Sequence, residues 1–103
     1  MHLTNGAGAE LEGPVLRIKA HLARKEFEPA RRLAEETIAR FPNAESPRVI
    51  LSYVYLQEGN DPTSAEQSLR EILVINPENA EAKHNLEVLL NSESGSNENF
   101  PKS

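Results

Sequence analysis

Cysteine and tryptophan are both absent from this chain of 103 residues, which contains only two tyrosines and three phenylalanines. Without cysteine there can be no disulfide, thiolate zinc ligand or cysteine nucleophile, so packing must stabilise the fold. The few aromatic side chains offer little surface on which bases could stack. The length suits one small domain with a single core and is too short for two.

Long apolar runs and an excess of positive charge are also missing. No stretch approaches the roughly 18 apolar residues of a membrane span, and the N-terminal segment lacks the apolar run of a signal peptide. The 16 acidic and 11 basic residues give a net charge of −5 at pH 7, which opposes binding to nucleic acid or to an anionic membrane. We therefore expect a cytoplasmic protein with neither nucleic acid nor a membrane as its partner.

Glycine and proline divide the chain into five segments of roughly 11 to 15 residues. Pro14, Pro47 and Pro62 directly follow Gly, Ser and Asp, so we expect each proline to occupy the first position of a helix. Gly59 suits a left-handed residue at the end of a helix. The punctuation therefore predicts five separate elements.

Apolar residues recur at helical spacing within these segments, as in Leu11, Val15, Ile18 and Leu22. No segment alternates as a half-buried strand does. The β-branched and aromatic residues at 48–56 and 72–75 leave buried strands as an alternative, although their place between helix caps favours helices. We predict an all-α fold of five antiparallel helices.

The two ends of the chain differ in composition from its middle. Residues 92–103 are mostly Ser, Asn, Glu and Gly, which cannot bury enough apolar surface to offset the entropy of ordering, so we predict a disordered tail. Residues 1–10, which include Gly6 and Gly8, are predicted to be a flexible lead. The folded domain is then expected over residues 11–91.

The chain repeats itself with a period of about 34 residues. An offset of 34 aligns Val15 with Val49 and the turn at Lys25 with Gly59. An offset of 35 aligns a second set of residue pairs, namely Ala30 with Ala65, Ile38 with Leu73, Pro42 with Pro77, Leu51 with Leu86 and Val54 with Leu89. Two helices per unit with a proline after the second indicate a solenoid of helical hairpins, in which no hairpin buries its apolar face alone.

At these residues the chain resembles the tetratricopeptide repeat family. Tyr55 and Gly59 match the first (A) helix of a repeat, Ala30 and Ala65 open second (B) helices, and a proline closes each B helix. The resemblance implies a superhelix of two and a half repeats, at residues 11–42, 43–77 and 78–91, the last being a solvating helix. Small alanines suit the close crossing of the two helices in each hairpin.

The first repeat departs from the family pattern. Arg17 stands where the family has a large apolar residue and Ile18 where it has a small one, which implies that the first helix is rotated by about one residue. Pro14 replaces a bulky residue, so we expect this helix to begin there and to be short. Two and a half units are fewer than the roughly three expected for independent stability, so the array continues or its ends are covered.

Signatures of catalysis, cofactor binding and metal binding are missing. His2, His21 and His84 are scattered without metal-ligand spacing. Glu35 and Glu36 stand among arginines and lysines on faces expected to be solvated, as do Glu26 and Glu28, which favours a salt-bridged surface over an acid/base pair. We therefore expect no enzyme activity, no cofactor and no metal.

The resemblance implies that the A helices line a concave groove in which a partner binds. The predicted protein-binding residues are Val15, Lys19, Leu22, Val49, Tyr53, Leu56, Gln57, His84, Asn85 and Val88. Tyr53 is the expected anchor, because a tyrosine combines a large apolar face with one hydroxyl. The alternative is that the aliphatic members of this set simply pack between neighbouring hairpins.

Family members that bind the acidic C-terminal peptides of chaperones hold the carboxylate with Lys, Asn and Arg. The matching positions here are Val15, Lys19, Ile50, His84 and Val88, of which only Lys19 is basic. The sequence therefore disfavours chaperone peptides and favours an extended or helical peptide with apolar side chains.

Three functions remain open. The first is a non-catalytic scaffold that binds a peptide segment of another protein, or of the same one. The second is a regulatory or targeting segment of a larger enzyme, because residues 33–36, 41–42, 56–59 and 84–86 look like repeat arrays attached to bacterial glycosyltransferases. The third is a homodimer that closes the apolar residues Leu86, Leu89 and Leu90 against a second copy.

Overall fold

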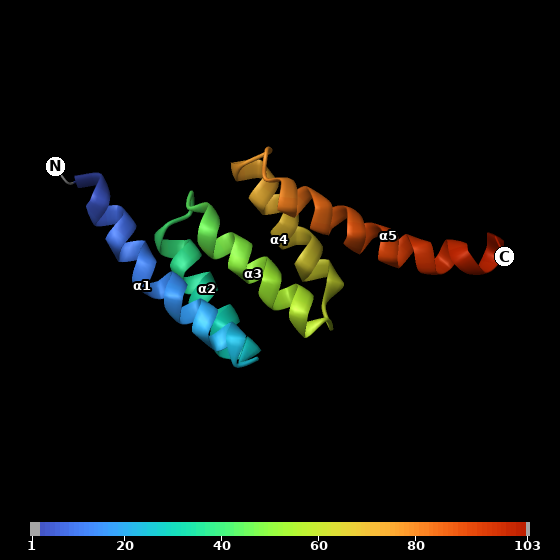
Figure 1. Ribbon diagram of the computed structural model, residues 1–103, viewed down its shortest axis with the longest axis horizontal. Coiled ribbons are helices and arrows are strands. Elements are labelled where there is room, and N and C mark those ends of the chain that lie inside the picture. The colour runs from blue at the N-terminus through green and yellow to red at the C-terminus, as the bar shows by residue number, and fades with distance from the viewer. Residues whose placement is uncertain (1–2, 103) are drawn as a thin grey trace.

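The computed structural model describes the backbone of residues 3–102 and the side chains of residues 10–92. This part of the chain forms helices and no strands (Figure 1). The five helices are α1 (Leu3–Ala23), α2 (Phe27–Arg40), α3 (Glu45–Glu58), α4 (Pro62–Ile75) and α5 (Ala80–Lys102). The all-α prediction is confirmed, and the alternative of strands at 48–56 and 72–75 is wrong.

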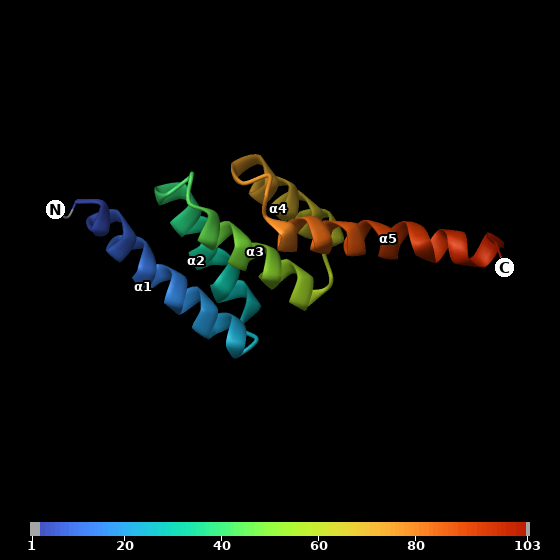
Figure 2. The same cartoon turned by 45° about the horizontal axis from the view of Figure 1, so that its top comes forward.

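Short loops reverse the chain between successive helices, as Figures 1 and 2 show from two directions. Each helix packs against the next one, and α1 also packs against α3. The resulting row of helices is elongated, with extents of 61 × 29 × 18 Å. The far end of α5 leads away from the other four helices in both views.

The three proline-based helix starts have different outcomes. Pro62 opens α4 as predicted, and the Asp61 carboxylate accepts hydrogen bonds from the Ser64 N–H (3.1 Å) and hydroxyl (2.7 Å). These bonds lower the pKa of Asp61. By contrast, α3 begins at Glu45, so Pro47 lies two residues inside it and Ser46 is not the cap. The first turn tolerates Pro47 because N–H groups there lack helical partners in any case.

The prediction that the first helix begins at Pro14 is wrong, because α1 begins at Leu3 and contains Pro14 in its interior. A proline inside a helix removes the hydrogen bond to the carbonyl four residues earlier, at a cost of about 3 kcal/mol. Pro14 and its neighbour Val15 are buried, so their packing opposes this cost. Tertiary contact thus overrides the local preference of proline.

The C-terminal ends of the helices agree more closely than their starts with the positions predicted from glycine and proline. Gly59 has a φ of 76° and donates its N–H to the Tyr55 carbonyl at 3.0 Å. Lys25, which the repeat aligns with Gly59, also has a positive φ, of 62°. The helices before Pro42 and Pro77 end at Arg40 and Ile75.

The core consists of two clusters. The first joins α1, α2 and α3 through Val15, Ile18, Ala30, Ala34, Ile50, Leu51 and Val54. The second joins α4 and α5 through Leu69, Ile72 and Ala82, with Val49 of α3 packed against it. Ala30 and Ala65 are 0% and 1% exposed, as the predicted close approach of paired helices requires.

Side-chain burial in α1 supports the predicted rotation of the first helix. Ile18 is fully buried, and Leu11 and Leu22 pack against the first cluster, whereas Arg17 is exposed. The predicted lead at residues 1–10 and tail at residues 92–103 lie almost wholly outside the residues whose side chains are described, so both stay predictions.

Candidate protein-binding groove

One side of α3 and the neighbouring part of α1 enclose an open hollow of about 390 Å³. Ser46, Val49, Ile50 and Tyr53 are spaced so that they lie on one side of α3. Lys19 of α1 completes the lining, together with Glu45 at the start of α3. The hollow therefore combines apolar side chains with two charged groups of opposite sign.

Tyr53 also connects this hollow to α5. Together with Val49 it lines a second, much narrower space, whose other walls include Glu81 and Asn85 of α5. The structure thus brings three predicted residues, Lys19, Val49 and Tyr53, into one hollow and places a fourth, Asn85, directly beside it. We call this surface of α1, α3 and α5 the groove.

The hydroxyl of Tyr53 lies near Glu81 of α5. Burial, a hydrogen bond to Glu81 and the negative charge of that carboxylate together raise the pKa of Tyr53 to about 12. The phenol is therefore neutral at physiological pH. A partner in the groove would meet mainly the apolar ring.

Glu45 is occupied by contacts within the protein. Its carboxylate accepts hydrogen bonds from the side-chain amide of Asn76 (3.2 and 3.1 Å) and from that of Asn79 (2.6 Å). The side-chain oxygen of Asn79 in turn accepts a hydrogen bond from the Ala82 N–H at 2.8 Å, which caps α5. Glu45 therefore connects the start of α3 to the loop between α4 and α5.

Lys19 is exposed and takes part in none of the ion pairs or hydrogen bonds formed by the described residues. With Glu45 bonded to two asparagines, Lys19 is the charged group of this hollow that remains available to a partner.

The other six predicted residues line neither of these two spaces. Val15 is only 9% exposed and belongs to the first core cluster, which is the packing alternative that the sequence left open. Leu22 and Leu56 are half-buried, whereas Gln57 and His84 are exposed. Val88 is 51% exposed on α5.

Several residues that line the groove were not predicted, among them Glu45, Ser46, Ile50 and Glu81. Ser46 and Ile50 share the helical spacing of Val49 and Tyr53, and Glu81 lies one turn before Asn85. Their spacing alone therefore places these three residues on the same helix faces as the predicted ones. Glu45 gave no such signal, because its asparagine partners are 31 and 34 residues away in the sequence.

The predicted salt-bridged surface is present in part. Glu26 lies 2.7 Å from Nδ1 of His21, and Glu28 accepts a hydrogen bond from Arg32 at 3.0 Å. Glu35 contacts the hydroxyl of Tyr55 instead of a basic side chain. Glu36 has no partner among the described residues.

Within the described residues, no cluster of three or more His, Asp or Glu side chains is placed to hold a metal ion. In the same part of the chain, no helix is both long and apolar enough to cross a membrane. No protein-family model, curated protein or solved structure matches the chain. The resemblance to tetratricopeptide repeats therefore stays a prediction.

Proposed function

We propose that the protein is a non-catalytic scaffold that binds a peptide segment of another protein in the groove formed by α1, α3 and α5. The observation that carries this proposal is the open hollow beside Tyr53, in which an apolar surface lies next to the available ammonium group of Lys19.

The shape and chemistry of the hollow suit a peptide better than a small metabolite. Pockets for small molecules usually enclose most of their ligand, whereas this hollow is open along α3. A half-buried aromatic ring resembles the anchors that dominate binding at protein interfaces. Apolar side chains of an extended or helical peptide would cover Val49 and the ring of Tyr53.

The arrangement of helices supports a tetratricopeptide-type scaffold. Every helix packs on its sequence neighbour and α1 packs on α3, as stacked hairpins would. The turns at Lys25 and Gly59, one repeat apart, share the left-handed conformation. A row of hairpins presents its A helices side by side, which is the arrangement that the groove requires.

Two other roles rank lower. A regulatory or targeting segment of a larger enzyme would use the same groove, and the length of the full gene product distinguishes that role from an independent scaffold. A homodimer through α5 is less favoured, because Leu86 and Leu89 pack against the second core cluster and so are only partly available.

The test is a selection of displayed random peptides on the 103-residue chain, followed by affinity measurements on variants. Tyr53→Ala should weaken the selected peptides about tenfold or more, as expected for an aromatic anchor. Phe41→Ala is the control, since Phe41 is also a half-buried aromatic residue but lines neither this hollow nor the one between α2, α3 and α4. Equal affinity for wild type and Tyr53→Ala, or a selection without enriched peptides, would refute the groove.

A further inference from the structure

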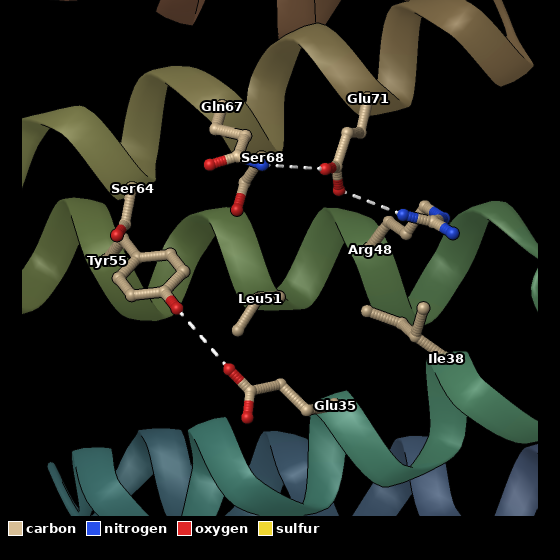
Figure 3. A pocket seen from close by; sticks show the side chains of 9 residues that line it. All are labelled: Glu35, Ile38, Arg48, Leu51, Tyr55, Ser64, Gln67, Ser68 and Glu71. Carbon is tan, nitrogen blue, oxygen red and sulfur yellow. Dashed lines mark hydrogen bonds and ion pairs between the residues drawn. The ribbon is translucent and has the colours of Figure 1, made fainter.

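A hollow of about 300 Å³ opens between α2, α3 and α4, on another part of the molecule (Figure 3). Its α3 residues, Arg48, Leu51 and Tyr55, lie on the side of that helix opposite to Val49 and Tyr53, given 3.6 residues per turn. The full lining is Glu35, Ile38, Arg48, Leu51, Tyr55, Ser64, Gln67, Ser68 and Glu71. This hollow is therefore separate from the groove.

At one end of the hollow, the charges of Arg48 and Glu71 neutralise each other. Arg48 pairs with Glu71 at 2.9 Å and donates two further hydrogen bonds to the Pro42 carbonyl, at 3.3 and 3.1 Å. The Gln67 side chain also donates to Glu71, at 3.3 Å. These contacts leave neither Arg48 nor Glu71 with a charge to offer a ligand.

The remaining charge is the carboxylate of Glu35. It forms no ion pair among the described residues, and its one contact is a long hydrogen bond from the hydroxyl of Tyr55, at 3.5 Å (Figure 3). Burial and the charge of Glu35 raise the pKa of Tyr55. The hollow thus carries a net negative charge beside an aromatic ring.

Ser68 adds an independent observation. It is only 6% exposed, and its hydroxyl makes no hydrogen bond to any described residue. Of the side chains at residues 10–92, two other hydroxyl groups are buried, and both are satisfied: Thr37 by the Leu33 carbonyl (2.7 Å) and Ser52 by the Val49 carbonyl (2.6 Å). Figure 3 shows the Ser68 oxygen directed from α4 toward α3, into the hollow. Since a buried hydroxyl without a partner is costly, this one calls for an occupant.

We propose that this hollow binds a primary ammonium group at the end of an alkyl chain. The ammonium would donate to the Glu35 carboxylate and the Ser68 hydroxyl, and the ring of Tyr55 would attract it further. Ile38 and Leu51 would cover the methylene groups of the chain. A lysine side chain of a partner protein and a free alkyl diamine share this chemistry, and the hollow is large enough for either.

The test follows backbone amide shifts of the isotope-labelled protein by NMR during titration with lysine capped at both its amino and carboxyl ends. Saturable shifts around Tyr55 and Ser68 are expected, and capped lysine acetylated on Nζ should not produce them. Cadaverine is the second probe: tighter binding than capped lysine identifies a free amine as the ligand, and weaker binding identifies a lysine side chain. No saturable shift with either amine, or equal shifts with the acetylated form, would mean that only water fills the hollow and would overturn the proposal.

Single substitutions distinguish a specific binding site from nonspecific attraction between the ammonium group and the negative charge of the protein. Ser68→Ala and Glu35→Gln should each weaken capped lysine about tenfold, as expected for loss of a hydrogen bond to a charged group. Glu36→Gln is the matched control, because Glu36 is exposed on the same helix and lines neither hollow. Equal weakening by Glu35→Gln and Glu36→Gln would refute the site. Tyr53→Ala should leave capped lysine bound, so this result is independent of the groove.

Discussion

At the scale of single residues, the two left-handed turns show where local sequence and backbone geometry agree and where they conflict. Gly59 adopts its φ of 76° without steric cost, whereas Lys25 adopts 62° although its Cβ disfavours that region. The repeat alignment had matched these two positions, but nothing about Lys25 itself indicated the conformation. The first turn therefore carries strain that the second one avoids.

Replacing these residues should change stability in opposite directions. We expect Gly59→Ala to lower the free energy of unfolding by about 1 kcal/mol and Lys25→Gly to raise it by about 0.5 kcal/mol. A Cβ at position 59 would have no neighbour closer than 3.9 Å, so the cost is one of backbone conformation. Urea unfolding measures both. Gly13→Ala is the control, because Gly13 lies within α1 and alanine there should stabilise the helix; a loss at position 13 as large as at 59 would contradict the explanation.

At the scale of elements, the sequence predicted the helices whose ends are set locally. Gly59 indicated where α3 ends, and Asp61 with Pro62 indicated where α4 begins, because caps and turn residues act over a few positions. The start of α1 was missed because the burial of Pro14 and Val15 depends on tertiary packing, which places Val15 in one cluster with residues of α2 and α3. The contacts of Glu45 with Asn76 and Asn79, and the presence of Glu35 and Ser68 in the lining of one hollow, likewise depend on packing between distant segments.

The link between α3 and α5 through Tyr53 predicts a specific pH dependence. In Tyr55→Phe, which retains one tyrosine, ultraviolet absorbance should show the phenol titrating at about 12. The folded pKa of Tyr53 exceeds the unfolded value of about 10, so its contribution to stability is constant below pH 10 and is lost as the pH rises from there toward 12. Glu81→Gln should lower the pKa of Tyr53. Titration near 10, unchanged by Glu81→Gln, would show that the hydroxyl is not held against α5.

At the scale of the whole molecule, the two core clusters stabilise different helices, so we expect local stability to differ between the two halves of the row. Ile18 and Ile72 are equally buried, at 0% and 1% exposed, and belong to the first and the second cluster respectively. In a row of helices that contact mainly their neighbours, stability is close to a sum of local terms, so the loss of one methylene should act near its own cluster.

Ile18→Val and Ile72→Val test this division with the same chemical change. Each should cost about 0.5–1.5 kcal/mol in the free energy of unfolding. Amide hydrogen exchange should then accelerate mainly in α1 and α2 for Ile18→Val, and mainly in α4 and α5 for Ile72→Val, because each substitution weakens the packing of those helices. The α3 helix contacts both clusters and should respond to either change. If both variants accelerate exchange uniformly along the chain, the five helices unfold as one cooperative unit, and a partner bound in the groove would stabilise α1 and α5 alike.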